Sequence, residues 1–117
     1  MRGKIVKNIL WFSHRKIDEY LTQINELLKK NYQEGEDDLK ELSIRIENFI
    51  ATCLEDGDRK LERYRSAVHG AVAVAGVEET EEEKQKEYVN KLRKMRGFLL
   101  AFKEEIELKS RYAKLRH

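Results

Sequence analysis

The chain has 117 residues, which is enough for one domain that buries roughly 65% of its unfolded surface. Its 24 Lys and Arg nearly balance 22 Asp and Glu, so the net charge of +2 is too small to indicate nucleic-acid binding by itself. The absence of proline and the many straight-chain residues favour an all-helical fold, and a single cysteine excludes an internal disulfide.

The first helix is predicted from about residue 4 to residue 32. Its apolar positions recur three and four residues apart and so share one face: Leu10, His14, Ile17, Leu21, Ile24 and Leu28, with Ile5, Tyr20 and Leu27 beside them. Lys7 and Asn8 interrupt the opening apolar stretch, so we expect no secretory signal. No window approaches the ~20 apolar residues of a membrane span, and we expect a cytoplasmic protein without a membrane partner.

Gly35 is predicted to end the first helix, because glycine adopts a left-handed cap without steric cost. Asp37 or Asp38 is then predicted to cap a second helix, with Glu41 in capping-box position. The second helix carries a heptad seam of Leu39, Leu42, Ile46, Phe49 and Cys53.

The sequence Asp56-Gly57-Asp58 predicts a tight turn, with Gly57 as the C-terminal cap of the second helix and Asp58 as the N-cap of the third. The third helix turns Leu61, Tyr64 and Val68 inward and runs at least to His69. It either ends at Gly70 or continues through the small residues 71–75 to Gly76, and the pattern leaves both outcomes open.

Thr80 and Glu83 form a capping box for a fourth helix, whose apolar period is the strongest in the chain. That period comprises Tyr88, Leu92, Met95, Leu99, Phe102 and Ile106. Four helices with one apolar seam each predict an antiparallel four-helix up-and-down bundle that forms a single domain over residues 1–117. We expect a homodimer, because the helices offer more apolar stripe than a thin bundle covers.

Basic residues gather at both ends of the chain, which such a bundle would bring beside the turn into the third helix. We predict a basic pole that approaches phosphates. Its nucleic-acid contacts are expected from Arg59, Lys60, Lys4, Lys7 and Lys114. The alternative is helix-end charge that serves solubility and complements the helix dipole.

The candidate catalytic residues are Arg63, Arg65 and His69. On a helix Arg65 and His69 share a face, whereas Arg63 and His69 diverge by roughly 120° unless the helix ends between them. An imidazole can move a proton and a guanidinium can hold a phosphate. These groups suffice for metal-independent RNA cleavage, in which the 2′-hydroxyl is the nucleophile, and we expect neither a metal nor another cofactor.

The segment from Arg63 to Gly70, RYRSAVHG, resembles the HEPN motif, in which Arg is followed after four to six residues by His near the end of a bundle's third helix. The resemblance implies an endoribonuclease whose site combines Arg and His from two subunits, often as a toxin in a toxin–antitoxin or anti-phage system. Other HEPN-like domains bind substrate for a nucleotidyltransferase. The implied partners are therefore RNA, an antitoxin or a nucleotidyltransferase, and a second copy of the chain.

Tyr64 stands where that family commonly has Asn, so two outcomes remain open: the aromatic residue is tolerated, or catalysis is lost. The alternative function is a non-catalytic helical bundle that acts as a protein interaction module, with the Arg/His cluster as an ordinary solvated face. His14 either reaches the site or is a partly buried core residue. Trp11 and Phe12 either stack on bases or complete a core or dimer interface.

Overall fold

The computed structural model describes the backbone of residues 2–69 and 79–115 and the side chains of residues 10–69 and 79–112. The predicted contacts of Lys4, Lys7 and Lys114 lie outside the described side chains. Whether the third helix continues through residues 70–78 also lies outside the described residues.

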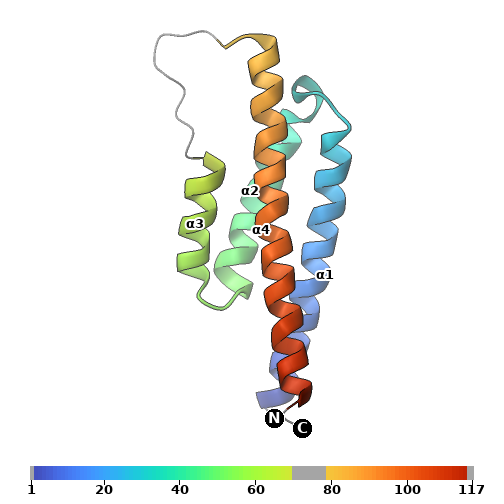
Figure 1. Cartoon of the computed structure of the whole chain (residues 1–117), viewed down its shortest axis with the longest axis vertical. Coiled ribbons are helices and arrows are strands. Elements are labelled where there is room, and N and C mark those ends of the chain that lie inside the picture. The colour runs from blue at the N-terminus through green and yellow to red at the C-terminus, as the bar shows by residue number, and fades with distance from the viewer. Residues whose placement is uncertain (1, 70–78, 116–117) are drawn as a thin grey trace.

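The described residues form four helices and no strand, which confirms the all-helical prediction. These are α1 (Arg2–Leu28), α2 (Tyr32–Cys53), α3 (Gly57–His69) and α4 (Glu81–Leu115). Figure 1 shows α4 lying lengthwise between α1 and α3, with α2 behind it. Short turns join α1 to α2 and α2 to α3, and α1 and α4 project together beyond the lower end of α2 and α3. α2 and α4 each contact the three other helices, whereas the described parts of α1 and α3 do not touch.

The core lies along the shared axis of the four helices and takes apolar residues from each. It consists of Ile17, Tyr20, Ile24, Leu27, Leu39, Leu42, Ile46, Phe49, Ile50, Tyr64, Val68, Tyr88, Leu92, Met95, Leu99, Phe102 and Ile106. All six residues of the predicted period in α4 are among them. On α1 the buried face is rotated from the predicted stripe: Tyr20 and Leu27 are buried, while Leu21 and Leu28 are only partly buried. This rotation follows from α1 packing against α2 as well as α4.

The boundary between α1 and α2 differs from the sequence prediction. Asn31 caps α2, because its side-chain oxygen accepts a hydrogen bond of 2.9 Å from the Glu34 N–H. Gly35 therefore lies inside α2, and the predictions of Gly35 as a helix end and of Asp37 or Asp38 as caps were wrong. Glycine is needed at position 35 because the Tyr88 ring packs against it, and a Cβ there would lie 2.9 Å from the ring carbon Cζ. The Tyr88 hydroxyl is held there by donating a 2.6 Å hydrogen bond to the Leu27 carbonyl.

The turn between α2 and α3 also differs in detail. Leu54 is the C-cap of α2 in an extended conformation, Asp56 adopts a left-handed φ of 57°, and Gly57 is the first residue of α3. Gly57 is thus not the cap of α2, and Asp58 lies in the first turn of α3 instead of capping it. Aspartate tolerates the left-handed region. Glycine is needed one residue later, since a Cβ there would lie 2.6 Å from the Ile50 carbonyl oxygen.

The start of α4 agrees with the predicted capping box. The Glu83 N–H donates to the Thr80 hydroxyl at 3.2 Å, and the Thr80 N–H donates to the Glu83 carboxylate at 3.4 Å. Glu81, Glu82 and Glu83 occupy the first turn, where negative charge is favourable to the helix dipole.

Candidate functional site

α3 is positioned by Tyr64, which is completely buried. Its ring meets the Phe98 ring of α4 edge-on at a centroid distance of 5.7 Å, and its hydroxyl lies 3.1 Å from the Ser43 hydroxyl of α2. Burial raises the pKa of Tyr64 to about 12. Tyr64 therefore anchors α3 in the core, and both of its neighbours, Arg63 and Arg65, are exposed.

Arg65 and His69 meet at one carboxylate, that of Glu47 on α2. The Arg65 Nε lies 3.0 Å from the Glu47 Oε1, and the His69 Nε2 lies 3.5 Å from the same oxygen. The Glu47 side chain is only 16% exposed, whereas that of His69 is 45% exposed. The four-residue spacing thus places both basic side chains on one face, and a largely buried glutamate holds them together.

Arg63 is separate from this cluster. α3 remains helical through His69, so the two residues are six positions apart on a continuous helix and diverge by roughly 120°. The exposed Arg63 side chain has no ion pair or hydrogen bond with the described residues. Its guanidinium is accordingly available to an external anion, whereas that of Arg65 is occupied by Glu47.

Glu47 is the member of the cluster that the sequence analysis missed. It follows the buried Ser43 by one helical turn and precedes the buried Ile50 by three residues, so it lies at the edge of the apolar seam. An acidic side chain at such an edge is the signal that could have identified it. Chemically, a carboxylate beside an imidazole can orient the ring, as the third member of a catalytic triad does.

His14 does not join the site. Its Nε2 lies 3.1 Å from the Glu107 Oε1 of α4, and its Nδ1 lies 3.6 Å from Asp18. Because the described parts of α1 and α3 do not touch, this histidine belongs to the contact between α1 and α4.

The described part of the predicted basic pole is largely paired with carboxylates. Lys60 lies 3.0 Å from Glu105, Lys109 contacts both Glu55 and Glu105, and Arg59 lies 4.0 Å from Asp56. A hydrogen bond to Glu55 is the main cause that raises the pKa of Lys109. Burial would raise the pKa of Glu105, but hydrogen bonds from Lys60 and Lys109 outweigh it and lower that pKa. Arg59 and Lys60 would therefore have to exchange partners before contacting phosphate.

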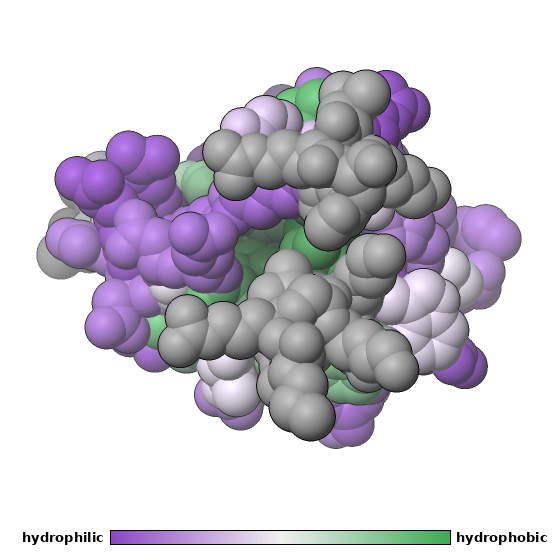
Figure 2. Space-filling model, turned by 90° about the horizontal axis from the view of Figure 1, so that it is seen from below, coloured by the Kyte–Doolittle hydropathy of each residue, from purple (hydrophilic) through white to green (hydrophobic). Residues whose placement is uncertain are grey.

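The charged side chains of Lys60, Glu105, Lys109 and Glu55 line a crevice of about 220 Å³ beside the turn between α2 and α3. Figure 2 views the molecule from below and shows hydrophobic surface inside a hollow, with hydrophilic side chains beside it. The crevice is lined by Leu10, Ser13, Phe102 and Ile106 among others. The Ser13 hydroxyl is buried there and has no hydrogen-bond partner among the described residues.

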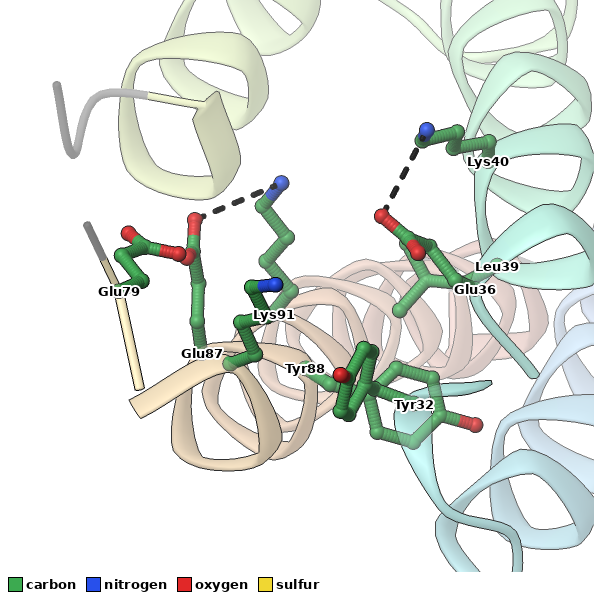
Figure 3. Close-up of a pocket in the computed structure, with 9 residues that line it drawn as sticks. Tyr32, Glu36, Leu39, Lys40, Glu79, Glu87, Tyr88 and Lys91 are labelled. Carbon is green, nitrogen blue, oxygen red and sulfur yellow. Dashed lines mark ion pairs between the residues drawn. The ribbon is translucent and has the colours of Figure 1, made fainter. Parts of the chain in front are cut away.

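A second hollow, of about 230 Å³, lies near the upper ends of α2 and α4. Figure 3 shows Tyr32 and Tyr88 beside each other, with the pair Glu36–Lys40 of α2 on one side and the pair Glu87–Lys91 of α4 on the other. The negative charge of Glu87 raises the pKa of Glu79. Three glutamates and three lysines line this hollow, so its charges balance. Sequence reasoning missed it because its residues come from segments about fifty positions apart.

Among the described residues, no group of three or more His, Cys, Asp or Glu side chains is placed to hold a metal ion. In the same part of the chain, no helix has the length and apolar character required to cross a bilayer. Comparisons with protein-family models, with curated proteins and with solved structures found no match. The resemblance of residues 63–70 to the HEPN motif therefore stays a prediction.

Proposed function

We propose that this chain is a HEPN-like RNA-binding protein that cleaves RNA without a metal, built as an antiparallel up-and-down bundle and working in the cytoplasm. The observation that carries the proposal is the convergence of Arg65 and exposed His69 on the carboxylate of Glu47. An exposed imidazole held by a carboxylate is suited to proton transfer on a polymer that approaches from solvent.

In this proposal His69 accepts the proton of the RNA 2′-hydroxyl while that oxygen attacks the adjacent phosphorus. The bond from phosphorus to the 5′-oxygen breaks, and the leaving oxygen takes a proton from solvent. The products are a 2′,3′-cyclic phosphate and a 5′-hydroxyl end. Arg63, which lies apart from His69 on the helix, binds a neighbouring phosphate of the RNA, because its guanidinium has no carboxylate partner among the described residues. Arg65 acts indirectly by fixing Glu47.

The buried position of Tyr64 bears on the departure from the family pattern. Its ring packs on Phe98 and its hydroxyl faces Ser43, so it is directed away from the surface that carries His69. The polar side chain that the family commonly places after the Arg has no counterpart there. We assign the task of orienting the imidazole to Glu47 instead, since its carboxylate lies 3.5 Å from the His69 Nε2.

The test is cleavage of a mixed tRNA and mRNA pool in EDTA. His69→Ala should slow cleavage by about 10²- to 10⁴-fold, the usual contribution of a general acid or base. Glu47→Gln should cause a smaller loss, because the imidazole remains but its orienting charge is removed. His14→Ala is the matched control, since this histidine is also paired with carboxylates but lies between α1 and α4.

The variants must show the helicity of the wild type before their rates are compared. Equal loss in His69→Ala and His14→Ala would contradict the assigned role. A folded wild type that cleaves no RNA would contradict the catalytic proposal, whatever the variants do.

A second candidate, a non-catalytic protein interaction module, is favoured by exposed apolar side chains near the lower end. Trp11 is 64% exposed, Phe12 45% and Leu108 57%, although the Arg15 guanidinium lies over the Trp11 ring. Exposed aromatic residues of this size are common anchors of protein interfaces. If the chain is an interaction module, His69→Ala should still bind the protein partner, whereas Trp11→Glu should not. An antitoxin or a nucleotidyltransferase is the partner that the HEPN resemblance implies.

A further inference from the structure

Gly97 lies in the interior of α4, and no contact with the described residues explains it. The glycines at positions 35 and 57 are required by close contacts, with the Tyr88 ring and with α2 carbonyls respectively. A Cβ added at Gly97 would meet none of the described atoms within 4 Å. A glycine inside a helix is less favourable than alanine by about 1 kcal/mol. The open space above Gly97 leaves room for a side chain of a partner molecule.

Gly97 belongs to an exposed face of α4 that also contains Arg93, Leu100 and Glu104. These residues are spaced by four, three and four positions, which keeps them on one side of the helix, away from the buried seam. Leu100 is 49% exposed, which is high for a large apolar side chain. Neither Arg93 nor Glu104 has a charged partner among the described residues. We call these four residues the α4 outer face.

The α4 outer face is complementary to itself. Because its spacings are the same in both directions, a second α4 lying antiparallel across a two-fold axis would place Leu100 of each copy over Gly97 of the other. The same axis would place Arg93 of each copy opposite Glu104 of the other. Two-fold interfaces have this reciprocal form, in which residue i contacts j and j contacts i. Each leucine then occupies open space above a glycine, and each arginine gains a carboxylate.

We propose that a second copy of this chain packs antiparallel on the α4 outer face. The complementarity is confined to the central turns, because the same alignment would bring Lys86 opposite Arg111. A single helix pair is expected to bury less than the standard ~800 Å² per partner, as weak and transient interfaces do.

The inference goes beyond the proposed function and does not depend on it. α3 contacts α4 through other residues, with Tyr64 against Phe98 and Lys60 beside Glu105. Self-association through the α4 outer face would leave the exposed side of His69 open. It would be equally compatible with an RNA-cleaving protein and with an interaction module.

The experiment is sedimentation equilibrium of the full chain from about 1 µM to 1 mM. Arg93→Glu and Glu104→Arg should each weaken self-association at least tenfold, because each places like charges opposite one another. The combined Arg93→Glu/Glu104→Arg variant should restore the wild-type constant within about threefold. Arg45→Glu, which changes the charge of an exposed side chain on α2, is the matched control and should leave it unchanged.

Gly97→Leu supplies an independent test, because the new leucine would fill the space that Leu100 of the second copy occupies in the proposed dimer. It should abolish dimerisation while the far-ultraviolet circular dichroism stays that of a folded helical protein. A wild type that is monomeric at 1 mM would overturn the proposal. So would a dimer whose dissociation constant is the same in both single charge variants.

Discussion

The same substitution, glycine to alanine, should have opposite effects at two helical positions. Gly35 lies in α2 against the buried Tyr88 ring, and Gly97 lies in α4 with nothing within 4 Å of an added Cβ. Both replacements gain the ~1 kcal/mol by which alanine exceeds glycine in a helix interior. The difference in stability between the two variants therefore measures the contact between Gly35 and Tyr88.

At Gly35 the methyl group would overlap the Tyr88 ring, since a Cβ would lie 2.9 Å from Cζ. Overpacking in a core costs about 1 to 3 kcal/mol, and displacing the Tyr88 hydroxyl from the Leu27 carbonyl loses a further ~0.5 to 1.5 kcal/mol. After the gain in helix propensity, Gly35→Ala should lower the free energy of unfolding by about 0.5 to 3.5 kcal/mol. Gly97→Ala should raise it by about 1 kcal/mol.

Urea unfolding followed by circular dichroism measures both variants at a protein concentration of about 1 µM, where self-association contributes little. Gly35→Ala should unfold at lower urea than the wild type, and Gly97→Ala at higher urea. If Gly35→Ala were as stabilised as Gly97→Ala, the contact with Tyr88 would not constrain α2. If Gly97→Ala were destabilised in the monomer, an unseen contact within the chain would explain that glycine.

Two further predictions concern buried hydroxyl groups. Ser13→Ala should raise the free energy of unfolding by about 1 to 2 kcal/mol in urea titrations, because it removes a buried hydroxyl that has no hydrogen-bond partner in the described part of the chain; a loss of stability would show that Ser13 has a partner. The pKa of Tyr64 is raised from 10.0 to about 12 in the folded protein. The contribution of its protonated hydroxyl to the free energy of unfolding is therefore complete below pH 10 and is lost as the pH rises toward 12. Between pH 9 and pH 11 the wild type should lose about 1 kcal/mol more than Tyr64→Phe, which keeps the ring but does not titrate. Equal losses in urea titrations at the two pH values would contradict the assigned burial of the hydroxyl.

The periodicity of apolar residues and the capping residues were sufficient to predict part of the fold from the sequence. α4 shows its whole core face in sequence, because its buried residues repeat every three or four positions, and Thr80 with Glu83 marks its start. The inward direction of Tyr64 and Val68 also followed from their spacing. In these stretches the local signals and the tertiary packing agree.

The boundary between α1 and α2 could not be predicted in the same way. A glycine at position 35 is typical of a helix end. Here glycine is needed because the side chain of Tyr88, 53 positions away, packs against its backbone. Asn31 was a competing cap whose oxygen reaches the Glu34 N–H. Choosing between these residues requires knowledge of which helix lies beside the turn.

The candidate site was predictable only within α3. Helical spacing places Arg65 and His69 together and separates Arg63 from them. The partner that joins Arg65 to His69, Glu47, lies on α2, and nothing local to α3 identifies it. The pairing of Lys60 with Glu105 is likewise a contact between distant segments, which is why a basic cluster in the sequence became a mixed network in the structure.

The most direct test of the proposed RNA function is equilibrium binding of a fluorescent single-stranded RNA, followed by anisotropy at several salt concentrations. Binding should weaken as salt rises, and Arg63→Ala should reduce the slope of log K against log salt by about 0.7, the value for one lost phosphate contact on a single strand. Arg45→Ala, an exposed arginine on α2 that pairs with Glu41, should leave the slope unchanged. Absence of binding by the folded wild type, or an equal change in the two variants, would contradict the account.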